Sequence, residues 1–158
     1  MRTLIRCGLA MFVAIAGASQ AQSAKNQAAL PDSAREKLVG AWRLAWMEEP
    51  GADGKLNRIT SRKGMLLYTR DGHMSVQIMF PKSESALSND YVQNGYEASF
   101  GSYDVDEGTH TVTHHVQGAL VRSLIGKNLT RVYRFEGKQL ILKSSRPDEH
   151  WTIAWEHN

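Results

Sequence analysis

Histidine is the residue type in this chain with the widest chemical use, and three histidines lie close together in its second half. His114 and His115 are adjacent, and His110 lies four residues upstream. A zinc site built on one strand needs its ligands on the same face, two residues apart. Adjacent side chains point to opposite faces, and His110 and His114 stand about 13 Å apart along a strand. The spacing therefore predicts no metal site.

One histidine of the adjacent pair must face the interior of a regular sheet. Val112 and His114 share an apolar face, and a four-residue turn would put Gly101 opposite His114, where it leaves room for the imidazole. Tyr103 is then its nearest hydrogen-bond partner. His114 is either a hydrogen-bonded core residue or a residue that contacts a ligand or transfers a proton, because histidine titrates near neutral pH. The catalytic residues of an enzyme stay unknown, with His114 and His115 as the candidates.

Arg131 is the second side chain that can do chemistry, because its strand face is otherwise apolar and aromatic. Leu129, Tyr133 and Phe135 share that face. The guanidinium has three possible roles: it stacks on Trp42 at a closed barrel end, binds the anionic head of a ligand, or extends into solvent.

A third polar group lies on the hairpin around Asp71-Gly72, which is typical of a two-residue turn. That turn places Tyr68 opposite Ser75, on a mixed face that also carries Gln77. The face is either exposed to solvent or a polar cavity wall. The predicted ligand-binding residues are Tyr68, Gln77, Tyr103, His114 and Arg131.

Sequence motifs for other chemistry are missing. The chain contains no G-x-S-x-G nucleophile elbow, no phosphate-binding G-x-x-x-x-G-K-[ST] loop and no H-E-x-x-H zinc helix. We therefore predict neither a cofactor nor a metal.

The elements that must position these side chains are short strands. Apolar and polar residues alternate with period two in short blocks from residue 39 to residue 156, with turn residues between them. Ser33 or Asp32 can cap a short helix over residues 34–38, and residues 81–95 carry apolar residues at roughly helical spacing. The pattern predicts an all-β fold, an antiparallel up-and-down barrel of eight or nine strands with one or two short helices.

The N-terminal residues 1–21 have the pattern of a signal peptide. Arg2 and Arg6 precede an apolar run without charge, and small residues follow at the expected cleavage site after Ala21. We expect residues 22–32 to form a flexible spacer and residues 33–158 to form the barrel domain. The run is too short for a membrane span, so we expect an exported protein, periplasmic or secreted, without a stable membrane anchor.

Cleavage at this site changes the apparent charge of the protein. The chain of 158 residues has a formal net charge of +3, and the leader holds two arginines and no acidic residue. It also holds Cys7, the only cysteine, so disulfides are not expected in the mature chain. No dense basic stripe survives, which argues against a nucleic-acid partner. The oligomeric state stays open.

Several longer strings resemble the bacterial and fungal lipocalin-like domain family. They are LVGAWRL (residues 38–44), LLYTRDGHMSVQIM (66–79), FGSYDVDE (100–107) and HTVTHHVQGAL (110–120). The resemblance covers residues 38–156 and implies a small calycin-type β-barrel. In the G-x-W motif of lipocalins, Trp42 would close one barrel end and Gly40 would leave room beside it.

Two classes of function fit these observations. The first is an exported lipocalin-like protein that binds a small, mostly hydrophobic molecule in the barrel cavity. The alternative is a cofactor-free enzyme of the isomerase or cyclase type, with His114 or His115 as acid/base and Arg131 or a tyrosine stabilising negative charge. A haem-binding barrel with a histidine ligand is a third, minor possibility.

Overall fold

The computed structural model describes residues 33–157, and the predicted signal peptide and spacer lie outside this range. The strands are β1 (Gly40–Pro50), β2 (Leu56–Ile59), β3 (Lys63–Tyr68), β4 (His73–Met79), β5 (Tyr96–Asp106), β6 (Thr111–Ala119), β7 (Asn128–Glu136), β8 (Gln139–Ser144) and β9 (Thr152–His157). One α-helix, α1 (Ala34–Leu38), and two 3-10 turns, η1 (Lys82–Glu84) and η2 (Arg122–Leu124), complete the described part.

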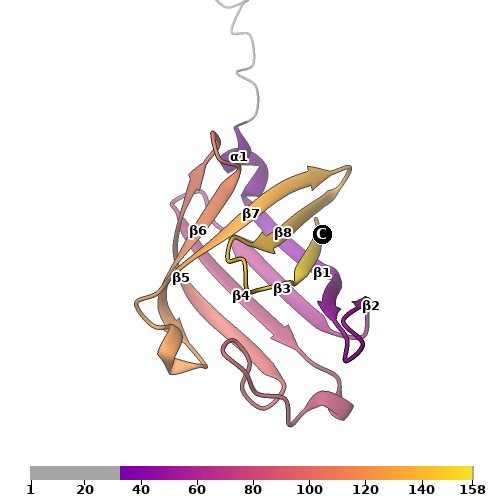
Figure 1. The fold of residues 1–158 in the computed structure, drawn as a ribbon. Coiled ribbons are helices and arrows are strands. Elements are labelled where there is room, and N and C mark those ends of the chain that lie inside the picture. Colours follow the sequence, from indigo (N-terminus) through magenta and orange to yellow (C-terminus); the bar gives the residue numbers. More distant parts are fainter. Residues whose placement is uncertain (1–32, 158) are drawn as a thin grey trace, which may run out of the picture. The chain divides into compact units, whose positions relative to one another are not determined.

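The strands form a closed antiparallel barrel (Figure 1). Strands β3 to β9 each pair with the next strand along the chain, and β1 closes the barrel by pairing with both β3 and β9. Strand β2 pairs only with the end of β1, so it is an extra strand beside the eight of the barrel. This arrangement confirms the predicted all-β up-and-down barrel, and closure leaves its strands without a free edge except at β2.

Helix α1 covers one end of the barrel (Figure 1). The Ser33 hydroxyl caps it by accepting a hydrogen bond from the Glu36 amide at 3.2 Å, as the sequence predicts. Leu38 is fully buried, and its carbonyl accepts a hydrogen bond from Trp42 Nε1 at 2.8 Å. Gly40 has a φ of 141°, and a Cβ there would lie 2.5 Å from the His157 ring, which packs on Trp42. This end is therefore filled by side chains.

The hairpin between β3 and β4 differs from its prediction. The loop has four residues, 69–72. The Thr69 amide donates to the His73 carbonyl, the Thr69 hydroxyl accepts from the His73 amide, and Gly72 between them has a φ of 90°. Tyr68 consequently pairs with Met74, and not with Ser75. A shift of one residue exchanges the two faces of a strand. Leu66 and Tyr68 face the interior, whereas the mixed polar face predicted for Tyr68 does not exist.

The hairpin between β5 and β6 is shifted by two residues, so its faces are as predicted. Val112 and His114 are buried, and Tyr103 pairs with His114. The predicted role of Gly101 is wrong. It lies opposite Val116 at a β-bulge, where a Cβ would collide with the carbonyl oxygen of His115 and not with the imidazole.

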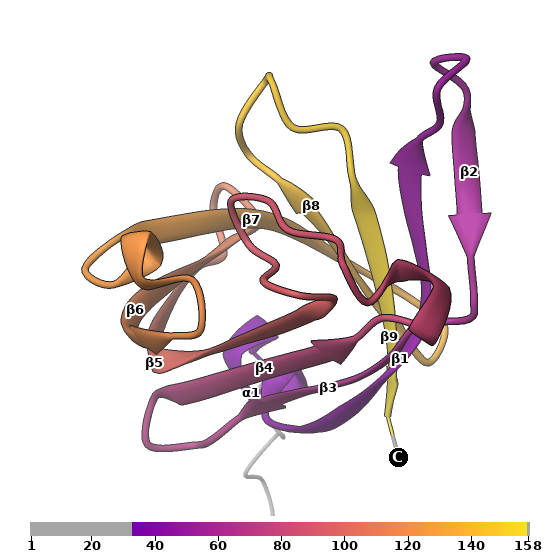
Figure 2. The ribbon, with the colours of Figure 1, turned by 90° about the horizontal axis from the view of Figure 1, so that it is seen from below.

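The segment between β4 and β5 (residues 80–95, hereafter the β4–β5 segment) contains η1 and turns, not the predicted amphipathic helix. The Asn89 side chain accepts hydrogen bonds from the amides of Tyr91 and Val92, an arrangement that competes with helix formation. Asn94 and Gly95 both have positive φ. The segment crosses the barrel end opposite α1 (Figures 1 and 2).

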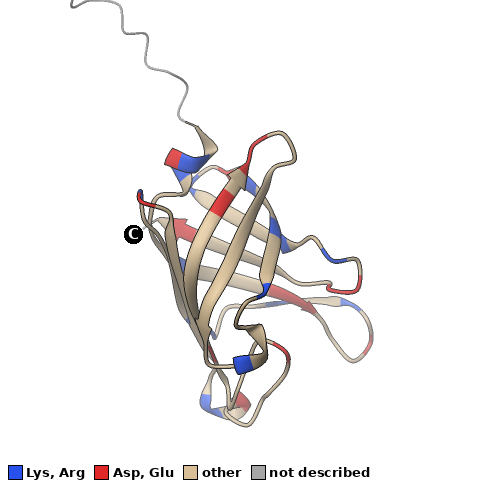
Figure 3. Ribbon diagram, turned by 90° about the vertical axis from the view of Figure 1, so that its left-hand side faces the viewer, with Lys and Arg blue, Asp and Glu red and all other residues tan. Residues whose placement is uncertain are grey.

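Charged residues of both signs are interspersed on the face shown in Figure 3. In the described part of the chain, no helix has the length and hydrophobicity that a membrane crossing requires.

Candidate functional site

A cavity of about 100 Å³ lies inside the barrel, under the β4–β5 segment. Most of its wall is apolar, and a few polar side chains interrupt it. The lining residues are Met47, Glu49, Leu66, Val76, Ile78, Phe80, Asn89, Tyr91, Val92, Glu97, Ser99, His114, Leu129, Arg131, Leu142, Trp151, Ile153 and Trp155.

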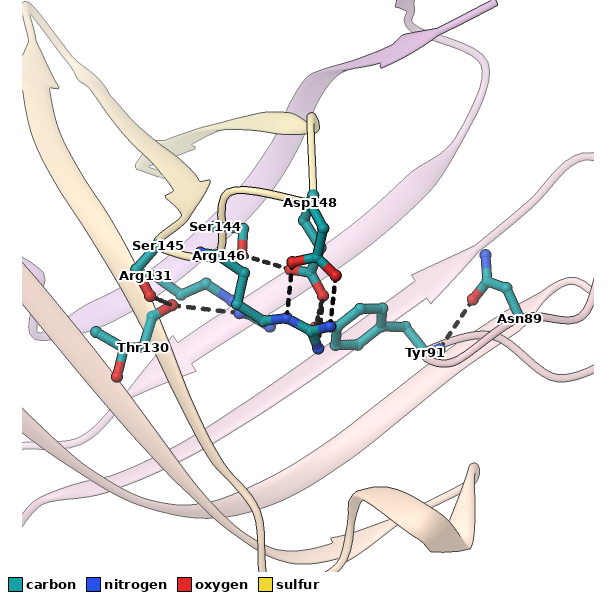
Figure 4. A network of polar contacts seen from close by, with 9 residues as sticks. Asn89, Tyr91, Thr130, Arg131, Ser144, Ser145, Arg146 and Asp148 are labelled. Carbon is teal, nitrogen blue, oxygen red and sulfur yellow. Dashed lines mark hydrogen bonds and ion pairs between the residues drawn. The ribbon is translucent and has the colours of Figure 1, made fainter.

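Arg131 on β7 is the central charged group of this cavity. The residue is 7% exposed, and its guanidinium lies 4.8 Å from the Trp151 ring centroid and 5.4 Å from that of Tyr91. One hydrogen bond is formed, from Nη1 to the Thr130 carbonyl at 3.3 Å (Figure 4). Arg131 therefore stacks on aromatic rings, but not on Trp42, which lies at the α1 end.

Tyr91 connects this group to the loop between β8 and β9 (Figure 4). Its hydroxyl donates to Glu149 Oε1 at 2.6 Å. Glu149 also accepts from Ser144 and pairs with Arg146 at 3.1 Å. Burial opposes ionisation of Glu149, but the hydrogen bonds from Ser144 and Tyr91 keep its pKa below the ordinary value. The hydrogen bond from Tyr91 to Glu149 thus attaches the β4–β5 segment to the loop between β8 and β9.

His114 borders the cavity as an uncharged side chain. It is 6% exposed, and its Nε2 lies 2.6 Å from the Tyr68 hydroxyl. Burial lowers the pKa of His114 to about 3, with the positive charges of Arg131 and His115 acting in the same direction. Burial also raises the pKa of Tyr68. Both groups are neutral near pH 7, so the two side chains share a hydrogen bond and carry no charge.

Three of the predicted site residues lie away from the cavity wall. Tyr68 stands behind His114, and the Tyr103 hydroxyl donates to the Thr69 carbonyl at 2.9 Å. Tyr68, not Tyr103, is therefore the partner of His114. Gln77 is exposed on the outer face of β4, because the adjacent residue Val76 points into the barrel and neighbouring side chains of a strand point to opposite faces. Among the five predicted ligand-binding residues, the cavity brings together His114 and Arg131.

His115 lies on the outer face of β6. Its Nδ1 is 2.8 Å from Asn128 Oδ1 and its Nε2 is 2.9 Å from Asp104 Oδ2. These hydrogen bonds raise the pKa of His115. Because His115 points away from the cavity, His114 is the one member of the pair that can contact a ligand there. Residues 33–157 contain no group of three His, Cys, Asp or Glu side chains arranged for a metal.

Several cavity residues were missed by the sequence reasoning. Glu97 faces the cavity, where burial raises its pKa to about 7 against the opposing charge of Arg131. The alternation of Gly101 and Tyr103, extended backwards along the strand, places Glu97 on the inner face and could have revealed it. Trp155 also lines the cavity, and its buried Nε1 has no hydrogen-bond acceptor among the described residues.

A second buried arginine lies at the same end of the barrel. Arg62 is 5% exposed and stacks 4.0 Å from the Phe80 ring centroid. Its Nη1 lies 2.7 Å from Glu49 and its Nη2 lies 2.8 Å from Glu84 of η1. These partners lie 13 and 22 residues away in sequence, so no local pattern reveals them.

Comparison with protein-family models gives a match over most of the chain. Residues 39–156 match the model of a family described as the lipocalin-like domain. No functionally curated protein matches the chain at significant similarity.

The solved structures that the chain is similar to have low sequence identity to it. A lipocalin-like protein from Bacteroides uniformis is 16% identical over 77% of this chain and 99% of its own, with a TM-score of 0.46. An uncharacterized protein from Bacteroides eggerthii is 14% identical over 77% and 99%, with the same TM-score. A variant of the fluorescent protein UnaG is 13% identical over 78% and 97%, with a TM-score of 0.41.

Proposed function

The chain belongs to the lipocalin-like domain family, and we propose that it is an exported protein that binds a small, mostly hydrophobic molecule inside its barrel. One observation carries the proposal: a closed barrel encloses a cavity with a mostly apolar wall, at the end that is covered by a loop segment and not filled by side chains. Such cavities are the usual sites for small ligands in barrels of this size.

The cavity volume sets the size of the ligand. About 100 Å³ is somewhat less than the apolar cavity of roughly 150 Å³ that holds benzene in an engineered protein. A molecule with one ring or a short chain therefore matches this conformation of the β4–β5 segment. A larger ligand requires the segment to move outward.

The enzyme alternative has less support from the same site. A general acid or base works best with a pKa near the working pH, whereas burial takes His114 to a pKa of about 3. His115, with its raised pKa, faces outward and is engaged by Asp104 and Asn128. A carrier uses His114 as a neutral hydrogen-bonding group, which its burial favours.

The test fills the cavity without changing the outer surface. Val76→Phe places a larger side chain in the lining of β4, and Gln77→Phe adds the same ring at the adjacent exposed position. We expect Val76→Phe to abolish binding of benzyl alcohol, followed by tryptophan fluorescence, since Trp151 and Trp155 line the cavity. Gln77→Phe should bind normally. Equal binding by both variants would contradict a ligand site inside the barrel.

The proposed export has its own test. Arg2, Arg6 and the apolar run that follows support a cleaved leader, which implies a periplasmic or secreted mature protein. Expression of the full chain in a bacterial host, followed by intact mass measurement of the exported fraction, should give a protein that lacks residues 1–21. A chain that keeps these residues in the cytoplasmic fraction would refute the proposal.

A further inference from the structure

Arg131 presents a buried positive charge that the described chain leaves without a counter-ion. Its guanidinium has five N–H donors; one donates to the Thr130 carbonyl, and the neutral Tyr91 hydroxyl is also near the group. No ion pair among the described residues includes Arg131. A buried charge of this kind is costly unless it is paired and hydrogen-bonded.

Arg62 shows how this chain satisfies a buried guanidinium when the role is structural. It also stacks on an aromatic ring, and it has nearly the same exposure. Two carboxylates, those of Glu49 and Glu84, lie within 2.8 Å of its nitrogens. Arg131 has the stacking without the carboxylates, so its N–H groups are available to something in the cavity.

Two acidic side chains lie near Arg131, and neither forms an ion pair with it: one is bound by other residues, and the other has a raised pKa. Glu149 is bound by Tyr91, Ser144 and Arg146. Glu97 faces the cavity without an ion pair or hydrogen bond to the described residues, and burial favours its neutral form. A neutral Glu97 can donate an O–H to an acceptor, which an anion in the cavity supplies.

A second unpartnered donor borders the same cavity. Trp155 is 1% exposed, and its Nε1–H lacks an acceptor among the described residues. Indole and guanidinium nitrogens donate but do not accept, so both require acceptor atoms from a bound molecule or from water. Arg131 lies over the rings of Tyr91 and Trp151, so these contacts use the face of the guanidinium, and its edge carries the N–H groups that can donate two parallel hydrogen bonds to a carboxylate.

We infer that the ligand is a small monocarboxylate: its carboxylate is bound by Arg131, and its compact apolar body lies against Leu66, Val76 and Ile78. This inference rests on the proposed small-molecule binding and names the chemical class of the ligand. The apolar part is limited by the cavity volume to about one ring.

Three single-ring probes of similar size and different charge test it: benzoate, benzyl alcohol and benzylamine. Binding is measured by calorimetry and by the indole N–H resonances of Trp151 and Trp155 in the protein without residues 1–21. Benzoate should bind about 10- to 100-fold more tightly than benzyl alcohol, the range expected for a charge-assisted hydrogen-bonded pair. Benzylamine should bind least.

Matched variants on one strand assign the effect to Arg131. Arg131→Met should remove the preference for benzoate over benzyl alcohol. Arg134→Met removes the same charge from the outer face of β7, where it pairs with Glu136, and should keep the preference. Arg131→Lys retains the charge without the two parallel donors, so it should keep a reduced preference and serves if the Met variant fails to fold.

The outcomes separate this inference from the proposed function. If benzyl alcohol binds as tightly as benzoate and shifts the same resonances, the site for small molecules stands and the carboxylate assignment fails. If no probe shifts either indole resonance, the proposed function fails as well. Loss of the preference in Arg134→Met, or a full preference in Arg131→Lys, would overturn the assignment to a bidentate Arg131.

Discussion

Arg62 and Arg131 are two buried guanidinium groups at the same end of the barrel, and they differ in what balances their charge. Each stacks on aromatic side chains of or near the β4–β5 segment. Arg62 is held by Glu49 and Glu84, whereas Arg131 has one hydrogen bond to a carbonyl. The comparison separates a charge that is part of the framework from a charge that is available for binding.

The same difference applies to the two attachments of the β4–β5 segment. Its first half is fixed to the barrel wall through Glu84 and Arg62. Its second half is attached by the Tyr91 hydroxyl, which reaches Glu149 over the face of Arg131. Opening of the cavity for a ligand should therefore begin at Tyr91, because the ion pairs of Arg62 hold the other half.

Replacement of each arginine by methionine gives the largest expected difference. Arg62→Met leaves Glu49 and Glu84 without their partner and should lower the free energy of unfolding by about 3 kcal/mol, the lower end for broken buried pairs, because both carboxylates are partly exposed. Arg131→Met removes an unpaired charge and keeps an apolar stem, so the change should stay within about 1 kcal/mol. Urea unfolding with unchanged m-values measures both.

Equal destabilisation by the two substitutions would contradict the comparison. It would mean that Arg131 stabilises the fold as strongly as Arg62, and that its stacking and single hydrogen bond suffice to balance its charge.

The next largest expected effect is a dependence of stability on pH that is caused by Glu97. Burial raises its pKa to about 7, with the charges of Arg131, Glu49 and Arg62 also acting on it. A folded-state pKa above the unfolded value means that its contribution is fully present below about pH 4.5 and is lost as pH rises through 7. The full pKa shift corresponds to about 3 kcal/mol over the range from pH 4.5 to 8, and the partial exposure of Glu97 reduces the expected loss of stability relative to Glu97→Gln to about 2 kcal/mol.

The same ionisation acts on ligand binding. A carboxylate ligand near Arg131 is repelled by ionised Glu97, so benzoate affinity should fall as pH rises through 7 in the wild type and stay nearly constant in Glu97→Gln. Glu136→Gln on the outer surface is the control and should follow the wild type. Parallel stability curves for the wild type and Glu97→Gln would show that Glu97 is hydrated and outside the cavity.

The alternation of residue types was sufficient to predict the barrel, because each strand buries one face and each hairpin joins neighbours in sequence. It also placed His114 on the buried face and grouped Arg131 with the apolar and aromatic residues of its strand, but it left the role of Arg131 open; β6 and β7 are regular around both residues. It failed at β3, where a loop closed by Thr69 has four residues, not two. That difference of one register position decides whether Leu66 or Leu67 is buried.

The rest of the site depends on contacts that no local pattern encodes. Arg62 lies outside any strand and meets Glu84 only when the β4–β5 segment folds back on the barrel. Tyr91 meets Glu149 across 58 residues of sequence. The periodicity that revealed the strands has no counterpart for such pairs, so the distinction between Arg62 and Arg131 could be drawn only from the folded chain.

Tyr91→Phe gives the smallest of these effects and tests the two attachments directly. The substitution keeps the ring over Arg131 and removes the hydrogen bond to Glu149, which should cost about 1 kcal/mol in local stability because the site is partly exposed. Backbone amides around Val92 should then exchange with solvent about fivefold faster, while those after Glu84 stay protected by its pair with Arg62.

Tyr96→Phe is the matched control, since no hydrogen bond of the Tyr96 hydroxyl is present among the described residues, and it should exchange like the wild type. Benzoate should also dissociate faster from Tyr91→Phe, because the half of the segment that covers Arg131 opens more often. Faster amide exchange in both halves of the β4–β5 segment would contradict this prediction. It would mean that the segment opens as one unit, with the Arg62 ion pairs and the Tyr91 hydrogen bond broken together.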